Sequence, residues 1–263
     1  MSSTDRAERI SHLRGALAAL ECASPRSARL KLTRELDSRL GGGLAGDALH
    51  EIAPAEPADA PAAFGFTLAL AARFMAARRA SALLAVEDFA CVQGGAPFGP
   101  GLVAHGLDLS RLVFVRAPDP GSLFQALEDA LKSGALAVVV GEVWRLSKYD
   151  LTVSRRLTLA ARAGATPALL MLPTAHGQTL STAAETRFEI AASPSLRAPS
   201  AGAGKPLPGA PAFAARLVKS RRGADPAKTL RLIWRSEEQA FDDPAIPVPV
   251  AAAPGDRSGA ARA

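Results

Sequence analysis

The stretch that decides the fold lies between Leu36 and Thr67. It contains a glycine run, Leu40-Gly41-Gly42-Gly43-Leu44, and a short apolar strand, Ala48-Leu49-His50-Glu51-Ile52. A loop over residues 53–64 follows, and the triplet Gly65-Phe66-Thr67 opens an apolar helix. A strand, a loop and a helix in this order have the layout of a phosphate-binding unit. The stretch therefore predicts the architecture of a nucleotide site.

The chemistry of such a site is missing. A working phosphate loop is rich in glycine, and its helix begins Gly-Lys-Ser/Thr, whereas Phe66 stands here in the place of the lysine. The loop has no glycine and no lysine, and it holds prolines, which lack an N–H donor, and carboxylates, which repel phosphate: Pro54, Pro57, Pro61, Glu56 and Asp59. We expect an inert slot at Gly65, Phe66 and Thr67 that holds no cofactor. A helix N-terminus at Gly65 would attract an anion only weakly, and an ordinary Ala/Pro surface loop is the alternative.

Composition sets the broad class. The chain has 263 residues, of which 48% are hydrophobic, enough for one sizeable core. Arg73 interrupts the longest apolar run, so no membrane contact is expected, and an N-terminus without a basic-then-apolar signal predicts a cytoplasmic protein. Cys22 and Cys91 stand in no metal-ligand spacing, which predicts no metal site. The net charge of +6 permits an acidic partner such as nucleic acid.

Short apolar runs alternate with helical patterns from about residue 48. The expected strands are 48–52, 82–86, 112–115, 136–140 and 168–172. One helix has a Ser122…Gln125 capping box and ends at Gly134, and another is capped by Asp150 and ends at Gly164. The pattern predicts an α/β fold with a mainly parallel sheet flanked by helices on both faces.

The flanking segments complete the predicted organisation. Residues 1–30 form an N-terminal helix and linker, 31–193 the α/β core and 194–211 a second linker. Residues 187–191 alternate as an antiparallel strand does, 212–235 form a basic β-hairpin packed on the core, and 236–263 form a disordered tail.

Acidic residues follow two of the expected strands. An ATPase needs a carboxylate after its second apolar strand, but Gly141 occupies that position and Glu142 lies one residue beyond, where a side chain turns to the other face. Glu87 and Asp88 could face the same cleft, although solvated loop carboxylates are the favoured interpretation. The scattered histidines follow no ligand spacing and are expected to be structural.

Two surfaces are candidates for contact with partners or DNA. The helix over residues 5–21 presents an apolar stripe with Ile10, Leu13 and Leu17. The hairpin concentrates cations at its turn, where Lys219, Arg221 and Arg222 could reach a phosphate backbone. A helix packed on its own domain and a solvated edge hairpin are the respective alternatives.

The chain resembles the RecA-like superfamily and, within it, the ImuA family of bacterial mutagenesis proteins. The resemblance rests on Leu40–Leu44 leading to His50-Glu51-Ile52, on Gly65-Phe66-Thr67 where RecA-like ATPases have Gly-Lys-Thr, and on Val138-Val139-Val140-Gly141-Glu142. It continues through 99–112, 127–135, 150–157 and 182–193, so that it covers roughly residues 30–193.

The resemblance implies a non-catalytic accessory protein of SOS-induced translesion DNA synthesis. Its implied partners are an ImuB-like inactive Y-family polymerase, an error-prone DnaE-type polymerase and RecA, with a weak contact to DNA in the nucleoid. The alternatives are a divergent RecA-family ATPase that takes its lysine from elsewhere, such as Lys148, and a SulA-like inhibitor of cell division.

Overall fold

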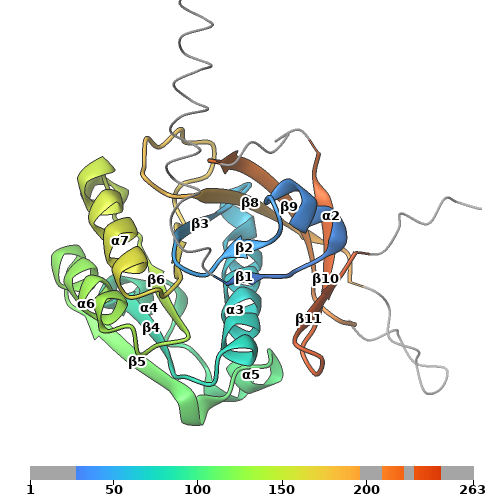
Figure 1. Cartoon of the computed structure of the whole chain (residues 1–263), viewed down its shortest axis with the longest axis horizontal. Helices are drawn as coiled ribbons and strands as arrows, with labels where there is room; N and C mark the ends of the chain where they lie inside the picture. Colours follow the sequence, from blue (N-terminus) through green and yellow to red (C-terminus); the bar gives the residue numbers. More distant parts are fainter. Residues whose placement is uncertain (1–27, 196–208, 222–227, 244–263) are drawn as a thin grey trace, which may run out of the picture.

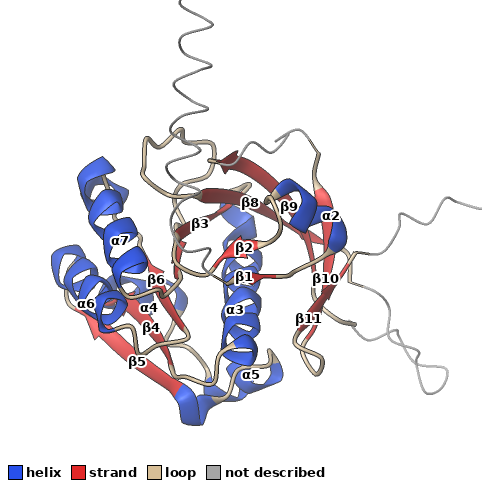
Figure 2. Cartoon of the chain, in the orientation of Figure 1, coloured by secondary structure: helices blue, strands red, loops and turns tan. Residues whose placement is uncertain are grey.

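The computed structural model describes residues 28–195, 209–221 and 228–243. Within these residues, one sheet has the strand order β11-β10-β9-β8-β3-β7-β6-β4-β5 (Figures 1 and 2). The predicted N-terminal helix with Ile10, Leu13 and Leu17, most of the linker 194–211, and Arg222 lie outside the described residues. The sheet strands are β3 (Leu49–Pro54), β4 (Ala82–Glu87), β5 (Leu112–Ala117), β6 (Val138–Glu142), β7 (Ala168–Met171), β8 (Thr186–Ser193), β9 (Ala212–Ser220), β10 (Leu230–Arg235) and β11 (Ala240–Asp242).

Six of these strands are mutually parallel. β8, β3, β7, β6, β4 and β5 pair in register as parallel neighbours. β3, β4 and β7 are buried along their whole length, because helices cover both faces of this half of the sheet. The predicted mainly parallel α/β fold is confirmed.

The other strands extend the same sheet in antiparallel fashion. β8 pairs parallel with β3 on one side and antiparallel with β9 on the other, so the antiparallel pattern predicted for 187–191 describes one of its two edges. β9 and β10 form the predicted hairpin, and their inner face buries Phe213, Ala215 and Leu217. The prediction of a disordered tail from residue 236 is wrong for β11, which pairs with β10. Three residues are too few to show a period, but Phe241 is 5% exposed and fixes the strand to the core.

Helices form a layer on each face. α3 (Ala60–Ala77) packs on one face, and α6 (Pro120–Ser133) and α7 (Leu151–Ala163) lie side by side on the other (Figure 1). The smaller elements are β1 (Arg29–Leu30), α2 (Arg34–Arg39), β2 (Leu44–Ala45), η1 (Pro57–Asp59), α4 (Asp88–Gly94), α5 (Gly99–Ala104), η2 (Leu109–Arg111) and η3 (Leu146–Lys148).

The helix ends follow local side-chain chemistry. Asp150 caps α7 by accepting a hydrogen bond from the Val153 N–H at 2.8 Å, as predicted. Gly134 ends α6 with φ 64°, a left-handed conformation that favours glycine. The start of α6 differs from the prediction, because the side chain of Asp119, rather than that of Ser122, accepts hydrogen bonds from the first turn.

α3 is apolar on nearly all sides. By length and composition alone, the helical run Pro57–Ala77 could cross a membrane, yet the structure uses it as the core helix of the fold. It buries Phe66, Leu70 and Met75 against the sheet and the elements around it. A helix that is hydrophobic all round is typical of such a buried position.

We predict that Phe241→Ala lowers the free energy of unfolding by about 3–5 kcal/mol, because the ring is buried among other aromatic side chains. Urea denaturation measures the loss. Phe98→Ala is the control, since Phe98 is 71% exposed and its truncation removes little buried surface. Equal stabilities of Phe241→Ala and the native chain would show that β11 does not contribute to the core.

Candidate functional site

The triplet Gly65-Phe66-Thr67 lies inside α3 rather than at its start. The prediction that Gly65 opens the helix is wrong, because helical structure already begins with η1 at Pro57 and α3 at Ala60. Proline at position 61 is compatible with this start, since the first turn of a helix needs no N–H from that residue. No free helix N-terminus therefore exists at Gly65 to attract an anion.

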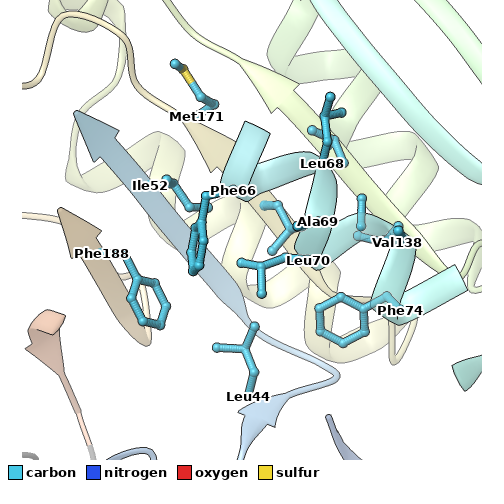
Figure 3. Packing of buried hydrophobic residues seen from close by; sticks show 14 of the residues in the cluster. Leu44, Ile52, Phe66, Leu68, Ala69, Leu70, Phe74, Val138, Met171 and Phe188 are labelled. Atoms are coloured by element: carbon cyan, nitrogen blue, oxygen red, sulfur yellow. The ribbon is translucent and has the colours of Figure 1, made fainter. Parts of the chain in front are cut away.

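Phe66 belongs to an aromatic cluster with Phe188, Phe213 and Phe241. Its ring centroid lies 5.6 Å from those of Phe188 and Phe213 and 5.5 Å from that of Phe241. The side chain is 0% exposed, and Figure 3 shows the ring on the side of α3 that faces Ile52 and Phe188. Phe66, which the sequence pattern aligns with a phosphate lysine, is thus a ring in the core.

The neighbours of Phe66 are engaged as well. The Thr67 hydroxyl donates a hydrogen bond to the Ala63 carbonyl at 2.8 Å and is fully buried, so it is not available to a magnesium ion. The Gly65 carbonyl lies 2.7 Å from Nε2 of His105, which joins α3 to the turn after α5. Burial lowers the pKa of His105, and the neutral ring can donate this hydrogen bond.

A carboxylate occupies the turn after β3. Asp59 Oδ1 accepts a hydrogen bond from the Ala192 N–H of β8 at 2.8 Å, and its Oδ2 lies 3.3 Å from the Glu56 N–H. Backbone donors that a phosphate would need here are already satisfied by a residue of the chain.

Gly141 and Glu142 face opposite sides of β6. A Cβ on Gly141 would lie 2.7 Å from Leu127 and 2.8 Å from Leu170, so this position is closed by α6 and β7. Glu142, the last residue of β6, accepts a hydrogen bond from Trp144 Nε1 at 2.8 Å. Burial raises the pKa of Glu142, and the nearby Glu87 adds to that rise.

Glu87 and Asp88 have different environments. Glu87 is 0% exposed; it accepts a hydrogen bond from Arg145 Nε at 2.7 Å and another from the Trp144 N–H at 3.1 Å. The solvated-loop interpretation is therefore wrong for Glu87, whose partner Arg145 the sequence could not indicate. Asp88 is half-exposed and pairs with Arg116 at 3.0 Å.

A second buried acid was missed by the sequence analysis. Glu51, in the middle of β3, pairs with Arg187 of β8 at 2.6 Å and accepts a hydrogen bond from the Tyr149 hydroxyl at 2.5 Å. Burial, followed by the charge of Glu51, raises the pKa of Tyr149 well above its ordinary value. The sequence signal for this buried acid is the position of Glu51 among the apolar residues of a predicted strand. These groups satisfy one another and form a cross-link of β3, β8 and the turn before α7.

Lys219 and Arg221, two of the predicted contact residues of the hairpin, have different environments. Lys219 Nζ donates hydrogen bonds to the carbonyl and the hydroxyl of Thr182 at 2.6 and 3.2 Å, and burial lowers its pKa. The ammonium group of Lys219 is therefore already hydrogen-bonded within the fold. Arg221 is exposed, and its backbone N–H donates a hydrogen bond to the Glu185 carbonyl at 3.0 Å.

Lys148 and His50 lie apart from each other, in different parts of the fold. Lys148 lines a groove of about 860 Å³ between α6 and α7, on the face of the sheet opposite α3. His50 is buried, with its ring nitrogens 2.8 Å from the Thr186 hydroxyl and the Ala45 carbonyl. Among the residues that the structure describes, no group of His, Cys, Asp and Glu side chains could hold a metal ion.

Exposed apolar side chains gather along one stretch of the chain, a feature that the sequence analysis missed. Seven of the nine large hydrophobic side chains exposed in the described part come from α4, η2, β5 and α5 with its N-cap residue, Phe98: Phe89, Val92, Phe98, Val103, Leu109, Val113 and Phe114. We call them the apolar edge surface. Among the strands that the structure describes, β5 is the last in the sheet, so its outer backbone groups pair with none of them.

Comparison with known proteins gives a partial match. No family model matches the chain. It is 37% identical over 124 residues to Protein ImuA from each of two strains of Caulobacter vibrioides, covering 46% of this chain and 46% of that protein. The chain thus matches about half the length of these curated relatives, and the predicted resemblance to ImuA is confirmed. A crystal structure of the RadB recombinase has a TM-score of 0.49 and 17% identity, covering 81% of this chain and 97% of that one.

We predict that Phe66→Lys, which restores the lysine of a phosphate loop, unfolds the protein and does not create ATP binding. A lysine there would bury an unpaired charge among aromatic rings, which costs several kcal/mol. Circular dichroism and an ATP titration check both parts. Phe66→Leu, which keeps the site apolar, should remain folded. A folded Phe66→Lys variant that binds Mg²⁺-ATP would contradict the structure of this site.

We predict that Glu142→Gln raises the melting temperature at neutral pH. Because burial raises the pKa of Glu142, the folded chain keeps this proton to a higher pH than the unfolded chain, and ionisation above that pKa costs stability. The neutral amide of glutamine avoids this cost, and each kcal/mol gained in the free energy of unfolding raises the melting temperature by roughly 2–4 °C. The gain should shrink as the pH falls toward the unfolded pKa of about 4.5. Melting curves across this range that show a gain growing toward acid pH would refute the assignment.

Proposed function

We propose that this relative of Protein ImuA is a non-catalytic accessory protein of SOS-induced, damage-dependent mutagenesis. It helps to assemble or position an error-prone polymerase complex, whose subunits are an ImuB-like inactive Y-family polymerase and a DnaE-type polymerase, with RecA as a further partner. The similarity to Protein ImuA over 124 residues supports the process. The geometry of α3 supports the non-catalytic part, since Phe66 and Thr67 are both fully buried.

The single observation that carries the proposal is the apolar edge surface. Val92 is 77% exposed and Phe98 71%. Large apolar patches on soluble proteins mark contact sites, because exposing them to water costs free energy. The outer backbone of β5 could also accept an extended segment of a partner as an additional strand.

The hydrogen bonds at the carboxyl ends of the parallel strands support the non-catalytic role. There the side chains of Asp59, Glu87 and Glu142 are already held by groups of the chain itself. In a nucleotide-dependent protein these groups would face the ligand. Lys148, the lysine of the alternative ATPase hypothesis, lies on the face opposite α3.

We predict that Val92→Asp with Phe98→Asp reduces copurification of ImuB-like and DnaE-type subunits from damaged cells at least tenfold. Each charge would be placed in a contact that excludes water, and tenfold corresponds to about 1.4 kcal/mol, which is within the range of one interface residue. Both side chains are largely exposed, so the fold should tolerate the changes.

The matched control is Leu151→Asp with Leu159→Asp, which adds the same charges at exposed leucines of α7. This control should capture the polymerase subunits as the native chain does. Equal capture by both variants would reject the apolar edge surface. Failure of the native chain to capture either polymerase subunit would reject the assembly role.

A further inference from the structure

One edge of the sheet gathers the beginnings of all its parallel strands. Because α3, α6 and α7 each lead into a following parallel strand, their C-terminal ends lie at this edge. Ser220 at the end of β9 lies there too, since it pairs with Thr186 at the start of β8. We call this side of the molecule the amino edge.

Hydrogen bonds join the cationic segments of the amino edge into one surface. Arg73 donates to the Lys31 carbonyl at 2.7 Å, which places β1 beside α3. Arg39 of α2 donates to the Lys228 carbonyl at 2.7 Å, which places α2 beside the start of β10. Arg29 lies 3.8 Å from Glu185, whose carbonyl binds the Arg221 N–H. The cations that these segments and the end of α3 contribute are Arg29, Lys31, Arg34, Arg39, Arg73, Arg78, Arg79, Arg221 and Lys228.

The two carboxylates of α2, Glu35 and Asp37, already make contacts within the protein. Glu35 pairs with Lys228 at 3.0 Å and with Arg39 at 2.8 Å, and the Lys228 hydrogen bond is the main cause of its lowered pKa. Asp37 accepts a hydrogen bond from the Leu32 N–H at 2.9 Å. By contrast, exposed cations on these segments make no side-chain hydrogen bond or ion pair within the described residues: Lys31, Arg34, Arg79 and Arg221.

Helix stabilisation accounts for only one of these free charges, that of Arg79. Cations favour the C-terminal end of a helix, which suits Arg78 and Arg79 after α3. Arg34, however, is the first residue of α2, where the helix dipole disfavours a positive charge. Lys31 precedes that helix and lies outside any helix end. Their side chains flank a depression of about 560 Å³ that is also lined by Thr33, Ser38 and Gly42.

The spread of the surface suits an extended polyanion. From β10 to β4 the strand order covers six steps, which at about 4.8 Å each amounts to roughly 30 Å. Several phosphates of a nucleic acid backbone span that length. A compact anion could contact only one part of it.

We propose that the amino edge binds the phosphate backbone of nucleic acid through Lys31, Arg34, Arg79 and Arg221. The surface extends the contact predicted for the hairpin turn across the whole edge of the sheet, and it replaces Lys219, whose ammonium binds Thr182. Backbone contacts of this kind carry no sequence information, so binding is independent of sequence. The proposal does not depend on the apolar edge surface.

The test uses the full chain and fluorescence anisotropy with a labelled single strand of about 20 nucleotides and the matching duplex, over a salt series. Lys31→Gln with Arg34→Gln should flatten the dependence of log K on log salt by about two, one for each cation. The same change weakens binding at least tenfold at roughly 0.1 M salt. Arg79→Gln with Arg221→Gln, toward the two ends of the surface, should act alike.

The matched control is Lys148→Gln with Arg155→Gln, which removes two exposed cations near the carboxyl ends of the strands. It should keep the native affinity within about twofold and the native salt dependence. Melting curves show that each variant is folded, and the tighter of the two DNA forms identifies the preferred ligand. No DNA binding by the native chain at low salt, or equal weakening by the control, would overturn the proposal. Partner capture should be unchanged in all these variants.

Discussion

The contact among four phenylalanine rings, that of Phe66 and three packed around it, is the interaction on which the rest of the structure depends. The rings come from α3, β8, β9 and β11, and their centroids lie 5.5–5.6 Å from that of Phe66. Such a cluster excludes water and joins elements that are distant in the sequence. It fixes the antiparallel strands to the parallel half of the sheet, so Phe66, which the sequence pattern aligns with a phosphate lysine, lies in the core of the fold.

This packing directs attention from the interior to the edges of the sheet. At the carboxyl ends of the strands, Asp59, Glu87 and Glu142 are held by Ala192, Arg145 and Trp144. Two surfaces carry exposed side chains that are available to a partner: the apolar edge surface beside β5 and the cationic amino edge. A protein that contacts partners and nucleic acid through separate surfaces can bring the two together, which is the proposed accessory role.

Local patterns in the sequence predicted much of the fold. The continuous apolar run Val138–Val140 marks a strand buried on both faces, and Asp150 and Gly134 act through groups within their own turns. What depends on distant partners could not be predicted in this way. Glu87 is buried because Arg145, 58 residues away, supplies its counter-charge. β11 exists because Phe241 meets Phe66, and a strand of three residues shows no period. The apolar edge surface depends on which strand lies last in the sheet.

The most direct test of the central claim is calorimetric titration of the native chain with ATP in the presence of Mg²⁺, paired with melting curves at the same concentrations. With Phe66 in the core, we expect no saturable heat and no rise in melting temperature. Saturable, Mg²⁺-dependent binding, with a stabilisation of about 2.7 kcal/mol at a hundredfold excess over Kd, would contradict the account.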